Sequence, residues 1–482
     1  MPESQDRVRA VRWSALDVLA RHGVNLLVAL VLARLVDPAD FGLIAMLQLF
    51  VGLANLFIDG GLGPALIQRQ GTTDEDEATV FYFNLTAAAT VATVLALLAP
   101  YVAGYYDRPV VRQLMWAMAL NVFIGAFGSI HVTLLTKRLA FGRLMRVGAV
   151  SSLISGALGI WVAWQGLGVW SLVCQSVSAS AVSVALLWLW NDWRPVRRFS
   201  ARSLRRMLRF GGYMVLAGAL DVTYSRVYTV LIGRFFSAPE LGYFWRATST
   251  RQMISDGFES VMGRVTFPVL SSLNGDRALL ASTTRKFLMG MMFVNVPVML
   301  GLAALVEPMV VVLFGERWLP TAPILQIICL AGALWPLHTT NLNALTAQGR
   351  SDLFLRMEVL KKSIGLVVVI AASLHSVMAV AWAQVCIGGV AFFINAHYSK
   401  ALLAYGPFRQ LADVAPYFLS ATGMAIVVRL ARMSLDVSPA IELVLSMALG
   451  AICYVGFMWV VRRRLLFTHL AQWARVLGIR TC

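Results

Sequence analysis

Charged residues are scarce in this 482-residue sequence, at 13% of the chain, whereas apolar residues make up 59%. Soluble domains carry about 25% charged and about 45–50% apolar residues. A water-soluble globule of this composition would lack the polar surface needed to cover itself, and a disordered chain would need low hydrophobicity. Each transmembrane helix needs about 20 apolar residues, because the hydrocarbon core is about 30 Å thick. The composition therefore predicts a polytopic membrane protein.

Cysteine is also scarce. The five cysteines form no C-x-x-C pair, and four of them lie inside apolar runs. This spacing excludes a disulfide framework and a cysteine-based metal site, and the sequence predicts no cofactor. The first apolar stretch carries Asp17 and Arg21 and is followed by no small-residue cleavage site. We therefore expect it to be retained as a first helix and not removed as a signal peptide.

Helix-length apolar runs predict about fourteen membrane spans and an all-α polytopic fold. The run at 240–270 is the most polar of them. The predicted spans cover residues 13–36, 41–63, 79–103, 110–135, 144–165, 168–190, 211–236, 240–270, 287–314, 321–345, 357–374, 376–398, 411–430 and 440–461.

The net charge is +17, which on a soluble protein would suggest nucleic acid as a partner. Here the positions of the basic residues explain the charge without nucleic acid. With both termini in the cytoplasm, 29 of the 41 basic residues fall in cytoplasmic segments and only five near the opposite side. The positive-inside rule requires this bias, and an error of one span would invert it downstream. The sequence thus predicts an even number of spans with both termini cytoplasmic.

The seven remaining basic residues are arginines inside predicted spans. Ionisable groups within a membrane are costly, and they are functional candidates by default. These residues are Arg21, Arg34, Arg226, Arg234, Arg246, Arg251 and Arg264.

An internal repeat relates residues 32–42 to residues 232–242 at an offset of 200. Both copies end one predicted helix and open the next, and six helices separate them. Parallel repeats of this kind pair about an axis along the membrane normal in transporters. The matched pairs are Arg34 with Arg234, Asp40 with Glu240 and Gly42 with Gly242.

The repeat predicts four parts in the chain. Two pseudo-symmetric six-helix lobes lie on either side of a basic cytoplasmic linker, which we expect to be solvated and to carry an interfacial helix. Two extra helices with a basic cytoplasmic tail follow. The parts are the N-lobe at 1–193, the linker at 194–210, the C-lobe at 211–405 and the extra helices with the tail at 406–482.

Six segments between residues 24 and 362 resemble the bacterial polysaccharide transporter family, in the family's order. The similarity is to the colanic-acid type of lipopolysaccharide or exopolysaccharide repeat-unit exporter, within the multidrug/oligosaccharidyl-lipid/polysaccharide superfamily. Several of the segments are loop motifs that hydrophobicity alone does not dictate. They read LVALVLARLVDPADFGLIAMLQLF, DGGLGPALIQR, LIGRFFSAPELGYFWRA, RVTFPVLSSLNGD, LVEPMVVVLFGERWLPTAPILQI and LTAQGRSDLFLRMEVLKK.

The resemblance implies two six-helix lobes around a central cavity that opens alternately to either side. It implies a flippase of the bacterial inner membrane and no enzymatic activity. The cargo would be an undecaprenyl-pyrophosphate-linked oligosaccharide repeat unit, moved from the cytoplasmic to the periplasmic leaflet for exopolysaccharide or lipopolysaccharide synthesis. Implied partners are this lipid-linked oligosaccharide, membrane lipids, and a polymerase and other polysaccharide-assembly proteins.

The pyrophosphate of such a cargo meets the largest barrier at the membrane midplane, and arginine binds phosphate bidentately while staying charged. On the first helix, Asp17, Arg21 and Asn25 are four residues apart and share a face in the cytoplasmic half. A neutral Asp17–Arg21 ion pair at the interface is an equally good interpretation. On the eighth span, Arg246 and Arg264 share a face, and Arg251 lies off it.

Sugar hydroxyls need hydrogen-bond partners and ring faces. Asp221, Tyr224 and Tyr228 share a face of the seventh span and are the candidates for this role. Ordinary packing with satisfied hydroxyls explains them as well. We predict Arg21 and Arg246 as the pyrophosphate station, with the other named residues as further substrate-binding candidates.

Two other classes of protein stay open. A cation-coupled multidrug antiporter would share the architecture but would need acidic or aromatic walls, and the excess of arginine argues against it. A membrane polysaccharide polymerase or ligase would need a catalytic surface, and no nucleophile–base constellation is present in the sequence. Coupling to a proton or sodium ion is open too. Its candidate carboxylates are Asp17, Asp59, Asp221, Asp256 and Glu259, with His131 and His338 as further titratable groups.

Overall fold

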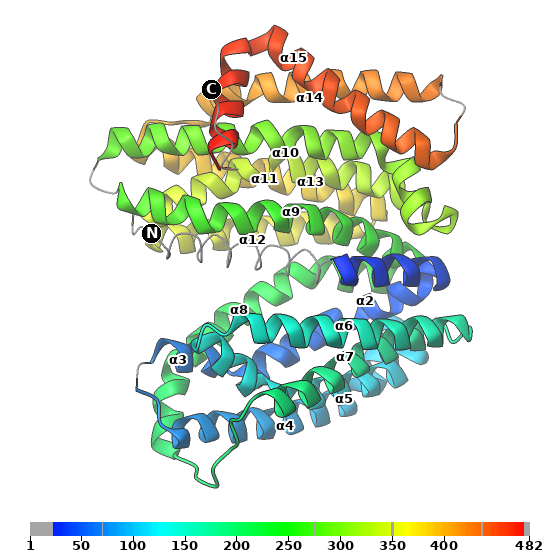
Figure 1. Ribbon diagram of the computed structural model, residues 1–482, viewed down its shortest axis with the longest axis vertical. Coiled ribbons are helices and arrows are strands. Elements are labelled where there is room, and N and C mark those ends of the chain that lie inside the picture. Colours follow the sequence, from blue (N-terminus) through cyan, green and yellow to red (C-terminus); the bar gives the residue numbers. More distant parts are fainter. Residues whose placement is uncertain (1–22, 70, 274–275, 349–350, 435–436, 477–482) are drawn as a thin grey trace, which may run out of the picture. The chain divides into compact units, whose positions relative to one another are not determined.

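The computed structural model describes residues 23–69, 71–273, 276–348, 351–434 and 437–476, and within these ranges its regular elements are all helices (Figure 1). The predicted site residues Asp17 and Arg21 lie outside them. The first helical stretch is Gly23–Leu35. It is followed by α2 (Pro38–Asp59), α3 (Leu62–Gln68), α4 (Asp74–Tyr106), α5 (Val110–Lys137), α6 (Phe141–Trp164), α7 (Val169–Trp190), α8 (Ala201–Phe235), α9 (Ala238–Ser272), α10 (Arg277–Phe314), η1 (Glu316–Trp318), α11 (Thr321–Ala347), α12 (Ser351–Ser373), α13 (Val377–Leu403), α14 (Pro407–Met433) and α15 (Pro439–Val476).

Eleven of these helices are long and apolar enough to cross a membrane, judged on the described residues. They coincide with eleven of the predicted spans, and the other three spans coincide with Gly23–Leu35, α9 and α12. The prediction of an all-α polytopic membrane protein is confirmed. The number fourteen stays a prediction, because α9 and α12 carry several charged residues and part of the first span lies outside the described residues.

The connections on the predicted cytoplasmic side hold one short helix that was not predicted and one helical segment that was. The short helix α3 follows α2 directly, because Gly60 and Gly61 adopt left-handed backbone angles, with φ of +56° and +67°. Glycine adopts such angles without steric cost. The linker was expected to carry an interfacial helix, and its second half is helical: α8 begins at Ala201, ten residues before the predicted span at 211.

Contacts divide the chain into two compact units, Met1–Gly242 and Tyr243–Cys482, and each is described by itself. In the first unit α4 packs along α5, α6 along α7, and α2 along α8. The predicted lobe boundaries around 194–210 stay a prediction. A lobe is a part of the chain that moves as one body, whereas these units are defined by contacts within a single state. One apolar cluster of the first unit joins α3, α4, α5 and the start of α8 through Leu62, Ala65, Leu66, Val80, Phe81, Ile130, Leu134, Trp193 and Met207.

The repeat is visible in the first unit as a reciprocal contact between helix starts. A Cβ atom added to Gly42 would lie 1.9 Å from the carbonyl oxygen of Ala238, and one added to Gly242 would lie 1.9 Å from that of Pro38. Pro38 and Ala238 are themselves related by the offset of 200. Only glycine allows backbones to approach this closely. The starts of α2 and α9 therefore cross in a pseudo-symmetric way that requires glycine at both repeated positions.

In the second unit α10 lies at the centre, packed against α11, α14 and α15. The last two helices are thus part of this unit's core: the hydroxyl of Tyr454 on α15 donates to the carbonyl oxygen of Phe293 at 2.8 Å. Asp413 on α14 accepts from Arg285 Nε at 2.7 Å and from the hydroxyl of Tyr405 at 2.8 Å. Burial and this hydrogen bond raise the pKa of Tyr405 above its usual range, so it stays a donor.

Candidate functional site

Of the three polar candidates on the first helix, the structure describes Asn25 alone. Its side chain is exposed, whereas Val28 and Leu32, which continue the same face, are 8% and 1% exposed. The described part of this face therefore passes from an exposed polar residue to buried apolar ones.

Arg246 is buried in a box of aromatic rings within the second unit. It is 6% exposed. Its guanidinium carbon lies 4.8 Å from the ring centroid of Phe314, 4.8 Å from that of Trp318 and 5.4 Å from that of Trp245. A cation within about 6 Å of a ring centroid is attracted by the ring quadrupole, by about 2 kcal/mol or more when desolvated.

Three elements build this box. Helix α9 supplies Arg246 and Trp245, α10 ends at Phe314, and Trp318 lies in η1. Gly315, with φ of +96°, turns the chain between Phe314 and Trp318, so both rings reach one guanidinium. The rings were missed in the sequence, although both belong to the loop motif FGERW. These rings stabilise the cation through their quadrupole and carry no charge of their own.

The other arginines of α9 have different surroundings. Arg251 donates to the side-chain oxygen of Gln252 at 2.8 Å and to the hydroxyl of Ser255 at 3.3 Å. Its side chain also packs against Gly332 of α11, where an added Cβ would lie 3.3 Å from Cδ. The side chain of Arg264 lies outside the described part of the structure. Arg251 thus packs against α11, whereas Arg246 packs against the end of α10.

The sugar candidates of α8 belong to the first unit. Asp221 is exposed, and Tyr224 and Tyr228 are half-buried. The two tyrosine hydroxyls lie within hydrogen-bonding reach of each other, one helical turn apart. These residues offer one carboxylate and two phenols along one helix, which is chemistry suited to hydroxyl-rich ligands.

The titratable residues considered for ion coupling have structural contacts. His131 is fully buried, lies 3.0 Å from the side-chain nitrogen of Asn191, and packs edge-on to Trp188 and Trp193. The carboxylate of Asp59 lies against the start of α3, where a Cβ atom added to Gly63 would lie 2.7 Å from its Oδ1. In the described parts of the chain, no three His, Cys, Asp or Glu side chains gather in an arrangement that could hold a metal ion.

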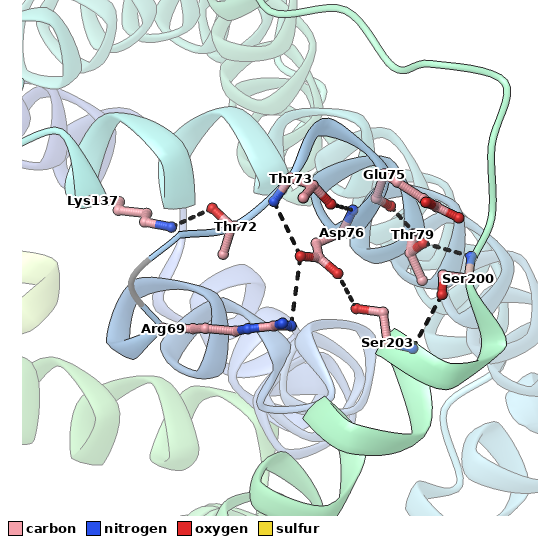
Figure 2. A network of polar contacts seen from close by, with 9 residues as sticks. All are labelled: Arg69, Thr72, Thr73, Glu75, Asp76, Thr79, Lys137, Ser200 and Ser203. Atoms are coloured by element: carbon pink, nitrogen blue, oxygen red, sulfur yellow. Dashed lines mark hydrogen bonds and ion pairs between the residues drawn. The ribbon is translucent and has the colours of Figure 1, made fainter.

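A polar network at the predicted cytoplasmic end of the first unit was not predicted (Figure 2). Its centre is Asp76 in the first turn of α4, which accepts from the backbone N–H of Thr73 at 3.1 Å and from the hydroxyl of Ser203. Arg69 lies 3.5 Å from the same carboxylate. The backbone N–H of Ser200 donates to the Thr79 hydroxyl at 3.0 Å. The network fixes the start of α8 to the start of α4.

The fold defined by these helices is that of a class of membrane transporters. A lipid II flippase, MurJ, superposes over 95% of this chain and 100% of its own, with a TM-score of 0.76 at 14% identity. A multidrug resistance transporter of the MATE family covers 79% of this chain with a TM-score of 0.62 at 15% identity, and 95% of that structure is matched. At such identities the similarity shows the fold alone.

The sequence comparison gives the family. A family model described as polysaccharide biosynthesis protein matches residues 31–323, more than half of the chain, and the protein belongs to this family. The teichuronic acid biosynthesis protein TuaB of Bacillus subtilis is 25% identical, over 83% of this chain and 84% of its own. The lipopolysaccharide biosynthesis protein WzxC of Escherichia coli is 24% identical, over 73% and 72%. The succinoglycan biosynthesis transport protein ExoT of Rhizobium meliloti is 28% identical, over 69% and 67%.

Proposed function

We propose that this protein is a flippase for an undecaprenyl-pyrophosphate-linked oligosaccharide repeat unit. It would move this cargo from the cytoplasmic to the periplasmic leaflet by alternating access, for exopolysaccharide or lipopolysaccharide synthesis. The observation that carries the proposal is membership of the polysaccharide biosynthesis family over residues 31–323. The MurJ-like fold over 95% of the chain supports it, because MurJ is a lipid II flippase.

The charges within the spans support an anionic cargo. Arg246 is 6% exposed among neutral rings, and a fixed charge acts strongly where water is excluded. We propose Arg21 and Arg246 as ligands of the pyrophosphate. Because the rings cover Arg246, the phosphate can reach it only when the box opens, which ties this contact to a conformational step.

The remaining candidates complete the proposed site. Tyr224, Tyr228 and Asp221 would bind sugar hydroxyls, while the residues of the first helix and α9 would receive the headgroup. The latter are Asp17, Asn25, Arg251 and Arg264. Coupling to a proton or sodium ion belongs to the same proposal, as does a polymerase as a partner in the membrane.

The distribution of basic residues supports the orientation that we propose for the chain in the membrane. Because 29 of 41 basic residues fall in predicted cytoplasmic segments, both termini would lie in the cytoplasm of a bacterial cell, with the chain in the inner membrane.

Polymer export in a strain that lacks its own exporter tests the arginine assignment. Losing a charge-assisted contact costs about 1.5–3 kcal/mol, or roughly ten- to a hundredfold in affinity. Arg246→Ala should therefore abolish most export, and Arg246→Lys should keep part of it, because lysine retains the charge but not the planar fork. Export is normalised to protein in the membrane, and Arg34→Ala serves as a control on an exposed arginine. Full export by an Arg21→Ala, Arg246→Ala double variant would overturn the assignment.

A cation-coupled multidrug antiporter is the second candidate, favoured by the MATE-like fold at a TM-score of 0.62. The two candidate functions differ in the charge of the cargo, which is negative for the flippase and positive for the antiporter. Thermal stabilisation of the purified protein by undecaprenyl pyrophosphate and not by a cationic dye supports the flippase. The reverse result supports the antiporter.

A further inference from the structure

The start of α8 carries a dense band of exposed arginines. Between Trp190 and Leu220 the only acidic residue is Asp192. Arg194 is used locally, since it donates to the carbonyl oxygens of Trp188 at 2.8 Å and Asn191 at 2.6 Å. Six further arginines are exposed over thirteen residues: Arg197, Arg198, Arg202, Arg205, Arg206 and Arg209.

Helix geometry fixes the direction of these side chains. Ser203, Met207, Gly211 and Val215 are buried at a spacing of four residues, so they form the inner face of α8. The four arginines within the helix, which are Arg202, Arg205, Arg206 and Arg209, fall off this face. The start of the helix is also pinned, because Ser203 donates to Asp76 and the backbone of Ser200 donates to Thr79 (Figure 2). The band is therefore a fixed surface and not a loose tail.

A groove lies directly beside the band. Its volume is about 560 Å³, and it is lined by residues from α2, α4 and α8. Phe57 and Phe83 form an apolar wall of the groove. Leu216, whose side chain is 65% exposed, extends this wall. Arg209 and Tyr213 lie at the same groove, and Tyr213 is 74% exposed. An added Cβ at Gly212 would meet no atom within 4 Å, so the groove is open there.

We propose that this groove and the arginine band form a binding site for an anionic phospholipid. The phosphate of the headgroup would contact Arg209, with Arg205 and Arg206 near it, and an acyl chain would lie along Phe57 and Leu216. A basic cluster immediately beside a membrane span attracts anionic headgroups by about 1 kcal/mol for each arginine. The apolar wall also needs an apolar ligand group to cover it, and a soluble phosphate has none. The inference is independent of the cargo.

The test measures lipid retained by the purified full-length protein. Native mass spectrometry counts bound dioleoyl phosphatidylglycerol against dioleoyl phosphatidylcholine as each lipid is titrated. Wild-type protein should retain the anionic lipid preferentially. An Arg205→Gln, Arg206→Gln, Arg209→Gln variant should weaken that binding by at least about tenfold. Gly212→Trp should weaken it as well, with no change of charge, by filling the groove.

Two matched controls separate the site from general charge and bulk. Arg138→Gln, Arg143→Gln, Arg146→Gln removes three other exposed arginines from a predicted cytoplasmic segment. Gly125→Trp adds the same ring at another open glycine. Both should bind phosphatidylglycerol as the wild type does.

Three results would overturn the proposal. They are equal retention of the two lipids by the wild type, equal losses in the controls, and wild-type binding by Gly212→Trp. Displacement of phosphatidylglycerol by an equimolar amount of undecaprenyl pyrophosphate would assign the groove to the cargo and would overturn the proposal too. Because binding is measured without transport, failure of the lipid site would not contradict the flippase function.

Discussion

A guanidinium group inside a membrane needs surroundings that offset its desolvation. Arg246 obtains this from three rings, Arg251 from Gln252 and Ser255, and Arg234 lies 5.6 Å from the ring centroid of Tyr105. Ring and amide partners are neutral, so they leave the positive charge in place.

The repeated glycines give a prediction at the scale of single residues. Gly42→Ala and Gly242→Ala should each reduce the amount of folded protein in the membrane, because the new Cβ would lie 1.9 Å from a backbone oxygen that cannot turn away. Overpacking costs about 1–3 kcal/mol even where side chains can adjust. Thermal stability of the purified variants measures the effect. Gly125→Ala, where an added Cβ meets nothing within 4 Å, should behave as the wild type. Equal stability of all three variants would contradict the reciprocal contact.

Single site residues were only partly predictable from the sequence. The seven arginines of the predicted spans became candidates because a charge in an apolar run is conspicuous. The rings around Arg246 were not found, because Phe314 and Trp318 lie about seventy residues away and only the fold brings them together. Asp76 was missed for the same reason, since its partner Ser203 is 127 residues further along the chain.

At the scale of elements, the start of α8 is the connection on which the first unit depends. The predicted linker is anchored at Asn191, which contacts His131, and at Ser200 and Ser203, which contact α4. These contacts turn a basic segment into a helix of defined direction. They also place the following span Gly211–Phe235 along α2.

Asp76→Ala tests this anchor. The substitution leaves the Ser203 hydroxyl and Arg69 without their shared carboxylate, at a cost of about 1–3 kcal/mol for each buried group left unsatisfied. Trypsin should then cut between α7 and α8, near Arg197 and Arg198, several-fold faster in inside-out membrane vesicles. Asp74→Ala, which removes an exposed carboxylate from the same turn, should leave the rate unchanged. Unchanged cleavage in Asp76→Ala would show that the network does not hold the linker.

Element positions were well predicted where hydrophobicity decides them. Each long apolar run of the described chain forms a helix, because a membrane leaves the backbone no other way to pair its polar groups. The miss follows from the same rule. Helix α3 has seven residues, so it produces no apolar signal of sufficient length.

At the scale of the whole molecule, the distribution of basic residues predicts the sidedness. In a variant without its five native cysteines, single cysteines at the exposed positions Gly104 and Ser438 should react with an impermeant maleimide from the periplasm. A cysteine at Arg198, also exposed, should react only after the cells are opened. Labelling of the Arg198 position in intact cells would contradict cytoplasmic termini.

The flippase proposal is tested most directly in proteoliposomes that hold an undecaprenyl-pyrophosphate-linked oligosaccharide. A glycosidase that cannot cross the bilayer is added outside, and the cleaved fraction of the lipid-linked sugar is measured over time. Without protein, only the outer-leaflet pool should be cleaved. With the purified wild-type protein, cleavage should proceed to nearly the whole pool, and it should return to the outer pool in the Arg21→Ala, Arg246→Ala double variant. A cleaved fraction that is the same with and without the wild-type protein would contradict the account.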